Sequence, residues 1–181
     1  MAHTEESLTP PSSIPADDFE RNLTVARPKD DATLSHLGLV GDTHTVLVTA
    51  EETAGRCTLI DMLVPAGGGP PPHRHDVEVM FSVLEGEIEV TFRGEQVIAR
   101  AGKTVNVPAN APHAFRNVAR ESARVLCRCT PPGQEVFFAQ VGVPVASRTE
   151  APAKLDPEAQ RAFAAKAMAL APAFRTELLL P

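Results

Sequence analysis

Between residues 43 and 130 the chain is a succession of short segments rich in strand-forming residues, separated by turns. Gly86 and Gly94 stand in two of these turns, and glycine adopts the backbone of a tight turn more easily than any other residue. Several short strands at such regular spacing predict an all-β sandwich or barrel. The expected strands are 43–49, 56–64, 77–84, 88–92, 96–100, 104–107, 113–118 and 124–130.

Beyond the strands the sequence becomes helical in character. Residues 133–142 are expected to form a short helix. A longer helix is expected over 159–171, because Asp156 offers an N-cap and Pro157 suits the first helical position. Residues 147–181 are therefore predicted to form a C-terminal linker and a helix that packs on the β domain or on a neighbouring subunit.

The N-terminal residues 1–31 are rich in Ser, Pro, Asp and Glu and show no apolar period. Such a composition indicates a flexible tail. The alternative is that residues 19–26 add a strand to the sheet of a partner subunit. A chain of 181 residues is long enough to form one domain with a substantial hydrophobic core, and it is short for two domains.

The charge and cysteine content exclude several classes of partner and compartment. A net charge of −6 without a block of like charges argues against nucleic acid and against an anionic membrane. No apolar run approaches the about 18 residues of a membrane span, and the N-terminus lacks the apolar region of a signal peptide. Three cysteines are too few, and odd in number, for a disulfide framework. A cytoplasmic location is therefore expected.

A pair of histidines follows a run of three glycines and three prolines at residues 67–72. Because alternate side chains of a strand share one face, His73 and His75 are predicted to point the same way. Two imidazoles on one face can bind a single metal ion, and imidazole is a common ligand of zinc, copper, iron and nickel. His113, about forty residues later, is the third candidate ligand.

The two histidine stretches resemble the paired motifs of the cupin superfamily. The first motif of that family contains His-x-His and closes on a glycine, here Gly86. The second reads Gly, five residues, Pro-x-Gly, two residues, His, three residues, Asn, and its spacing is matched by Gly102, Pro108, His113 and Asn117. Asn110 replaces the middle glycine, a mild change because asparagine tolerates a left-handed backbone. The resemblance implies a single jelly-roll β-barrel over residues 32–146, with a metal held by His73, His75 and His113.

The family pattern also has a glutamate ligand, which would fall at position 79, and this chain has Val79 there. Glu78 is one residue short, and a shift of one residue on a strand turns a side chain to the other face. A bulge that re-aims Glu78 would make it a candidate general base, the catalytic role assigned to it here. An inward Val79 would make one wall of the site apolar and leave room for a chelating substrate. The alternative is that valine is simply a good strand residue.

Phe81, Phe115, Val79 and Met62 are the predicted lining of a substrate pocket, by strand alternation. The alternative is that these residues only fill the barrel. Cys127 and Cys129 also share an inward face. They are either soft metal ligands or, more commonly for buried cysteine, small hydrophobic residues.

The predicted function is a metal-dependent dioxygenase that cleaves a small apolar or aromatic chelating substrate, as the likeness to monocupin proteins related to quercetin dioxygenases implies. The cofactor would be one divalent first-row transition metal, namely Fe, Mn, Ni, Co, Zn or Cu. The alternatives are a metal-dependent lyase or isomerase and a non-catalytic binding module. A homodimer is expected, because the outlying segments need a surface to pack on.

Overall fold

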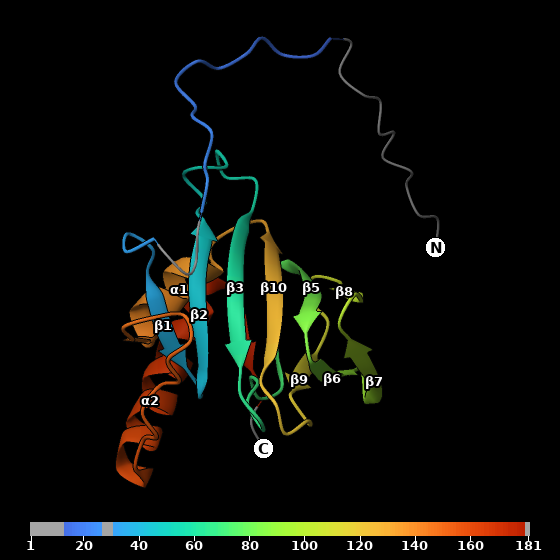
Figure 1. Cartoon of the computed structure of the whole chain (residues 1–181), viewed down its shortest axis with the longest axis vertical. Coiled ribbons are helices and arrows are strands. Elements are labelled where there is room, and N and C mark those ends of the chain that lie inside the picture. Colours follow the sequence, from blue (N-terminus) through green and yellow to red (C-terminus); the bar gives the residue numbers. More distant parts are fainter. Residues whose placement is uncertain (1–12, 27–30, 180–181) are drawn as a thin grey trace.

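The computed structural model of the chain describes residues 13–26 and 31–179. Its strands form two antiparallel sheets (Figure 1). One sheet has the order β11-β1-β2-β3-β10-β5-β8, and the other has the order β12-β4-β9-β6-β7. The strands are β1 (His36–Leu39), β2 (Asp42–Val48), β3 (Thr58–Val64), β4 (His73–His75), β5 (Glu78–Glu85), β6 (Glu87–Phe92), β7 (Glu95–Arg100), β8 (Thr104–Val107), β9 (His113–Arg116), β10 (Ala123–Thr130), β11 (Val143–Pro144) and β12 (Thr176–Leu178).

The two-residue period of the strands decides which face of each sheet is buried. On β5, Val79, Phe81 and Val83 are buried while Glu78 and Met80 are exposed. The inward faces of both sheets share one apolar core, which includes Ile60, Met62, Val64, Ile88, Val90, Val107, Phe115, Val125 and Cys127. This arrangement confirms the predicted all-β jelly roll. Among the described strands no ladder joins the two sheets, so the jelly roll is an open sandwich rather than a closed barrel.

A second apolar core lies where helices cover β1. The helical elements are α1 (Gln134–Val141), α2 (Pro157–Leu170) and the 3₁₀ turn η1 (Ala171–Phe174). In Figure 1, α1 and α2 lie on the β1 side of the molecule, away from β6 and β7. The cluster contains Leu37, Leu39, Phe137, Val141, Ala167 and Ala171, with Phe138, Phe163, Leu170, Phe174 and Leu178 packed against it.

Helix α2 begins where its cap predicts. The carboxylate of Asp156 accepts hydrogen bonds from the backbone N–H groups of Glu158 and Ala159, which satisfies donors that the first helical turn leaves free. The helix runs into η1, and Arg175 then turns the chain in a left-handed conformation into β12. No helix within the described residues combines the length and apolar character needed to cross a bilayer.

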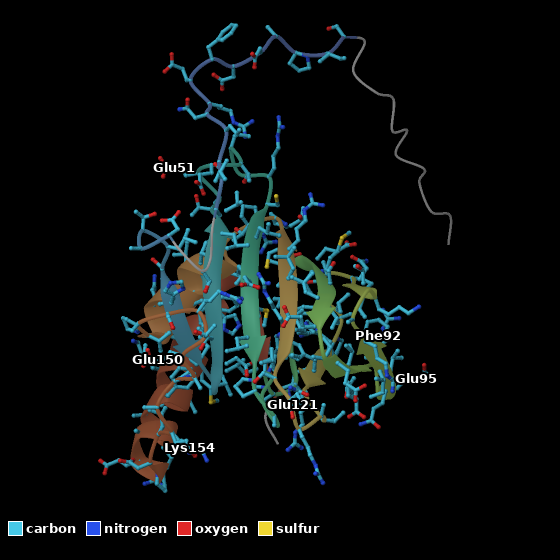
Figure 2. The ribbon with its side chains drawn as sticks, viewed as in Figure 1. Glu51, Phe92, Glu95, Glu121, Glu150 and Lys154 are labelled. Carbon is cyan, nitrogen blue, oxygen red and sulfur yellow. The ribbon has the colours of Figure 1, made fainter. Side chains whose placement is uncertain are left out.

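The predicted N-terminal tail lies partly outside the described residues, which leave out 1–12 and 27–30. Residues 13–26 form no helix or strand and extend away from the sheets (Figure 1). Arg21 and Thr24 donate hydrogen bonds to Glu52, in the loop between β2 and β3. Figure 2 shows the neighbouring Glu51 at this end of the molecule. Strand addition to a partner by this segment stays a prediction.

Candidate metal centre

Two neighbouring strands bring the three predicted ligands together. His73 and His75 are the ends of β4, and His113 opens β9, where it lies directly opposite His73. One ligand nitrogen from each ring lies within 4.8 Å of the other two. The ring centroids are 4.3 Å apart for His73 and His113, 4.9 Å for His75 and His113, and 5.4 Å for His73 and His75.

Backbone carbonyls fix how each imidazole presents its nitrogens. The Nδ1 atoms of His73, His75 and His113 lie 2.9, 2.8 and 2.9 Å from carbonyl oxygens two residues away along the chain. Because a carbonyl only accepts, each Nδ1 carries the proton and donates it. Each Nε2 is then the free acceptor, the state in which neutral imidazole binds metals.

Burial keeps all three rings neutral. Desolvation, reinforced by the neighbouring His113, lowers the pKa of His73 to about 3. The same two causes lower the pKa of His75 to about 4. Burial also lowers the pKa of His113. Imidazoles that are unprotonated near pH 7 bind a cation without first releasing a proton.

The loop before β4 is held against the strand that carries His113. Gly69 has a φ of +127°, and a Cβ at this position would overlap the carbonyl oxygen of Phe115. The backbones of Gly68 and Asn117 are joined by a hydrogen bond of 2.9 Å. The Asn117 amide donates to the carbonyls of Val64 and Glu121. The family's asparagine therefore braces a turn here and does not face the histidines.

The turn between β8 and β9 also contacts the first motif. Asn110 adopts a left-handed backbone with a φ of 67°, as the glycine it replaces would. Its backbone N–H donates to the carbonyl of His75 at 2.8 Å. The second motif therefore supports a ligand of the first as well as supplying His113.

Val79 and Glu78 take opposite faces of β5. Val79 is 2% exposed and faces the core, whereas Glu78 is exposed and its carboxylate accepts a hydrogen bond from Asn106 at 2.8 Å. The register is regular around both residues, because Glu78 pairs with Thr130 and Val79 with Cys129. The bulge that would turn Glu78 inward is therefore missing from this part of β5. The structure does not bring Glu78 to the histidines, so we assign it no catalytic role.

The predicted pocket residues lie in the core beside the histidines. The Phe81 ring centroid is 6.5 Å from that of His113 and 5.2 Å from that of Phe115. Val79, Phe81, Phe115 and Met62 are each 5% exposed or less. All four belong to the apolar core of the sandwich, and Phe81 links this core to His113.

Cys127 and Cys129 both face the core, and their sulfur atoms lie 3.8 Å apart. The contact with the Cys129 sulfur and, after it, burial raise the pKa of the Cys127 thiol, which disfavours the thiolate that metals bind. Among the described residues neither sulfur belongs to the group formed by the three histidines. Both cysteines act as small apolar residues of the sandwich.

Strand β12 is the part of the site that sequence reasoning missed. It pairs with β4 and places Thr176 opposite His75 and Leu178 opposite His73. This strand has only three residues, Thr176–Leu178. That is too short for the alternation of buried and exposed residues that identifies a strand in a sequence.

The donor set fits a first-row transition metal. Each of the three neutral imidazoles offers one nitrogen to the group, and the Nε2 of His113 is buried without a hydrogen-bond partner. Imidazole nitrogens suit zinc, copper, iron and nickel. An ion at the centre of the group would give this orphaned nitrogen its partner.

Comparisons with known proteins agree with this geometry. A family model described as a cupin domain matches residues 60–129. Polyketide synthase CurC of Streptomyces cyaneus is 32% identical over 118 residues, which cover 64% of this chain and 72% of CurC. Quercetin 2,3-dioxygenase of Bacillus subtilis (strain 168) is 30% identical over 73 residues, which cover 40% of this chain but only 22% of the dioxygenase.

Among solved structures, a predicted oxalate decarboxylase from Thermotoga maritima superposes with a TM-score of 0.52. The superposition covers 59% of this chain and 98% of that protein, at 18% identity, so the likeness concerns the fold alone. The jelly roll, the two histidine motifs and a relative covered over most of its length lead to the same assignment, and the chain belongs to the cupin superfamily.

Proposed function

We propose that the protein holds one divalent first-row transition metal, namely Fe, Mn, Ni, Co, Zn or Cu, through the Nε2 atoms of His73, His75 and His113. The observation that carries this proposal is the buried Nε2 of His113, which has no hydrogen-bond partner. Leaving a buried polar atom unpaired costs about 1–3 kcal/mol, and coordination would remove that cost. Three histidines leave further positions open for a substrate and for oxygen.

The reaction we propose is the oxygen-dependent cleavage of a small apolar or aromatic substrate that chelates through two oxygen atoms. The similarity to quercetin 2,3-dioxygenase supports this choice, because quercetin carries neighbouring hydroxyl and keto oxygens. The buried rings of Phe81 and Phe115, of which Phe81 lies beside His113, support an aromatic or apolar substrate body.

The chain's own residues would orient the reactants and exclude water. When bound, the metal would supply Lewis-acid and redox chemistry. Phe81 and Val79 would keep solvent from the inner side of the site, while His73, which is partly exposed, would mark the side from which the substrate enters. Among the described residues no carboxylate joins the histidine group. We therefore expect the acidic hydroxyl of the substrate to lose its proton to solvent on the open His73 side rather than to a carboxylate.

A second candidate is a metal-dependent lyase or isomerase reaction that consumes no oxygen. The longer of the two alignments, with polyketide synthase CurC, favours it. Polyketide chains carry 1,3-dicarbonyl groups, which chelate a Lewis-acidic ion as readily as a hydroxy-ketone does. A non-catalytic binding module is the third possibility, and it would bind its ligand through the same three histidines.

Metal analysis of protein purified without chelator is the first test, and about one equivalent of metal per chain is expected. Oxygen uptake is then followed with the metal-loaded protein and either quercetin or a simple 1,3-diketone. Oxygen consumption matched to substrate loss supports the dioxygenase. Product formed under nitrogen supports the second candidate, and binding without turnover supports the third. Metal-free protein that takes up none of the six ions contradicts the metal site itself.

We also propose a cytoplasmic homodimer. The three cysteines are free, which supports a reducing compartment. Phe19 and Leu23 are 88% and 90% exposed in the N-terminal segment, and a second copy would cover them. Light scattering at micromolar concentration tests this, and a monomer would contradict it.

A further inference from the structure

The strand that carries two of the three candidate ligands is held unequally by its neighbours. Toward β9, the register of β4 contains the single pair His73–His113. Toward β12 it contains three pairs, which include Thr176 opposite His75 and Leu178 opposite His73. Most of the backbone pairing that holds the two ligands of β4 therefore comes from the C-terminal end of the chain.

The pairing extends beyond β12 at both of its ends. The backbone N–H of Asp76 donates to the carbonyl of Arg175 at 3.1 Å, and the N–H of Leu179 donates to the carbonyl of Pro72 at 2.8 Å. We call residues 175–179 the C-terminal arm. Hydrogen bonds of the arm thus flank the His-x-His segment on both sides.

Side chains reinforce the seam between the arm and β4 on its outer face. Arg74 pairs with Glu177, and Arg175 pairs with Asp76. A polar depression of about 570 Å³ lies along this seam and is lined by these four residues together with His75. Exposed ion pairs contribute only about 0–1 kcal/mol each, so the backbone ladder must supply most of the stability of the seam.

The helical extension holds the arm in place from behind. Thr176 accepts a hydrogen bond from the side chain of Gln134 at 3.2 Å and donates one to the carbonyl of Phe174. Leu178 and Phe174 both pack against the second apolar core. The arm is therefore fixed to the helices on one side and to the ligand strand on the other.

We propose that the C-terminal arm is a positioning element of the metal site. By pairing with β4 it holds His73 and His75 at the spacing from His113 that lets one ion contact all three rings. This inference rests on the proposed metal site. Since coupling between two events is reciprocal, the arm strengthens metal binding and metal binding in turn stabilises the arm.

The test separates the backbone of the arm from its side chains at one position. The bonds at Asp76 and Leu179 and the alternation of an antiparallel ladder make Glu177 and Arg74 a hydrogen-bonded pair. Glu177→Pro removes a ladder donor, whereas Glu177→Ala removes only the exposed ion pair. We expect Glu177→Pro to weaken Zn²⁺ and Co²⁺ binding about tenfold or more, the loss typical when groups supporting a metal ligand are removed. Glu177→Ala should stay within about twofold of the unmodified chain.

Two further measurements report on the role of the arm. The Co²⁺ absorption bands should change in shape and intensity in Glu177→Pro, because a displaced histidine alters the coordination number. In the unmodified protein, Zn²⁺ should slow hydrogen exchange at the amide of Leu179 and leave unchanged the amide of Gly142, which is bonded to Phe138. This second readout needs no variant, so it decides the question even if Glu177→Pro does not fold.

The outcomes distinguish the two proposals. Unmodified protein that binds no metal overturns the proposed metal site and the role of the arm together. Unmodified protein that binds Zn²⁺ without protecting Leu179, or a folded Glu177→Pro with unchanged affinity and an unchanged Co²⁺ spectrum, overturns the role of the arm alone.

Discussion

Val79 lies directly opposite Cys129 on the inner face of the seven-stranded sheet, at the position where the cupin motif has a glutamate. The chain thus keeps the inward orientation of a fourth ligand while replacing its chemistry with an apolar group. A substitution at this position reports directly on whether the three histidines bind a metal.

Val79→Glu should bind metal at least about tenfold more tightly, a gain of ~1.4 kcal/mol, because a carboxylate joins the three nitrogens. Without metal the same variant should be less stable by about 1–3 kcal/mol or more, since the new polar group is buried unpaired. Chelator competition measures the first effect, and urea unfolding of the metal-free protein measures the second. Unchanged affinity together with reduced stability would show that Val79 has only a packing role.

His113→Ala should abolish stoichiometric metal binding, because it removes a ligand nitrogen of the histidine group that is both buried and unpartnered. Glu78→Gln is the matched control from the outer face of the same sandwich, and it should keep full metal occupancy. Elemental analysis of both variants checks the pair. Full occupancy in His113→Ala would remove this residue from the ligand set.

The pH dependence of stability should reveal the buried carboxyl group of Asp42. Asp42 is 1% exposed, and burial raises its pKa to about 8 against the pull of a hydrogen bond from the Gly69 backbone. The unfolded chain has a carboxyl pKa of about 3.9, so between that pH and about 8 the folded state binds the extra proton. Stability should therefore fall as pH rises through this window, by at most ~1.4 kcal/mol per pH unit.

Asp42→Asn carries no such proton and should remove this slope. Urea unfolding of both proteins at several values between pH 5 and pH 8 makes the comparison. The free energy of unfolding of the variant should rise steadily relative to that of the unmodified protein toward pH 8. If the two free energies depend on pH in the same way, the pKa of Asp42 is not raised.

Gly69→Ala should destabilise the protein more than Gly94→Ala, although both glycines have positive φ values of +127° and +89°. At Gly69 a Cβ would overlap the Phe115 carbonyl, while at Gly94 it would meet no atom within 4 Å. Gly94→Ala should lower the free energy of unfolding by only about 1–2 kcal/mol, the cost of a left-handed backbone at a residue with a side chain. Thermal unfolding measures the difference, and equal losses would mean that the loop moves away from Phe115 at little cost.

Much of the fold and the histidine group follows from the two-residue period of strands. Alternation alone puts His73 and His75 on one face and places Phe81 and Val79 opposite Glu78. The approach of His113 needed the family resemblance, because only the topology of a jelly roll brings β9 beside β4. Asn110 shows the same limit, since its left-handed backbone follows from its residue type while its bond to the His75 carbonyl does not.

The contribution of the C-terminal arm could not be predicted. Thr176 and Leu178 belong to a three-residue strand, and their partners lie about a hundred residues earlier in the chain. Local sequence patterns do not predict pairing between segments so far apart in the chain. The sequence also could not predict that the two sheets form an open sandwich. Whether a barrel closes depends on the register between strands and on what covers β1.

Phe138 packs against both apolar clusters, the one inside the sandwich and the one beneath the helices. Its ring also lies 5.1 Å from that of the buried His44. Heating should therefore melt the β domain and the helical extension in a single calorimetric transition. Truncating this one ring should split the endotherm into two, with the helices melting first.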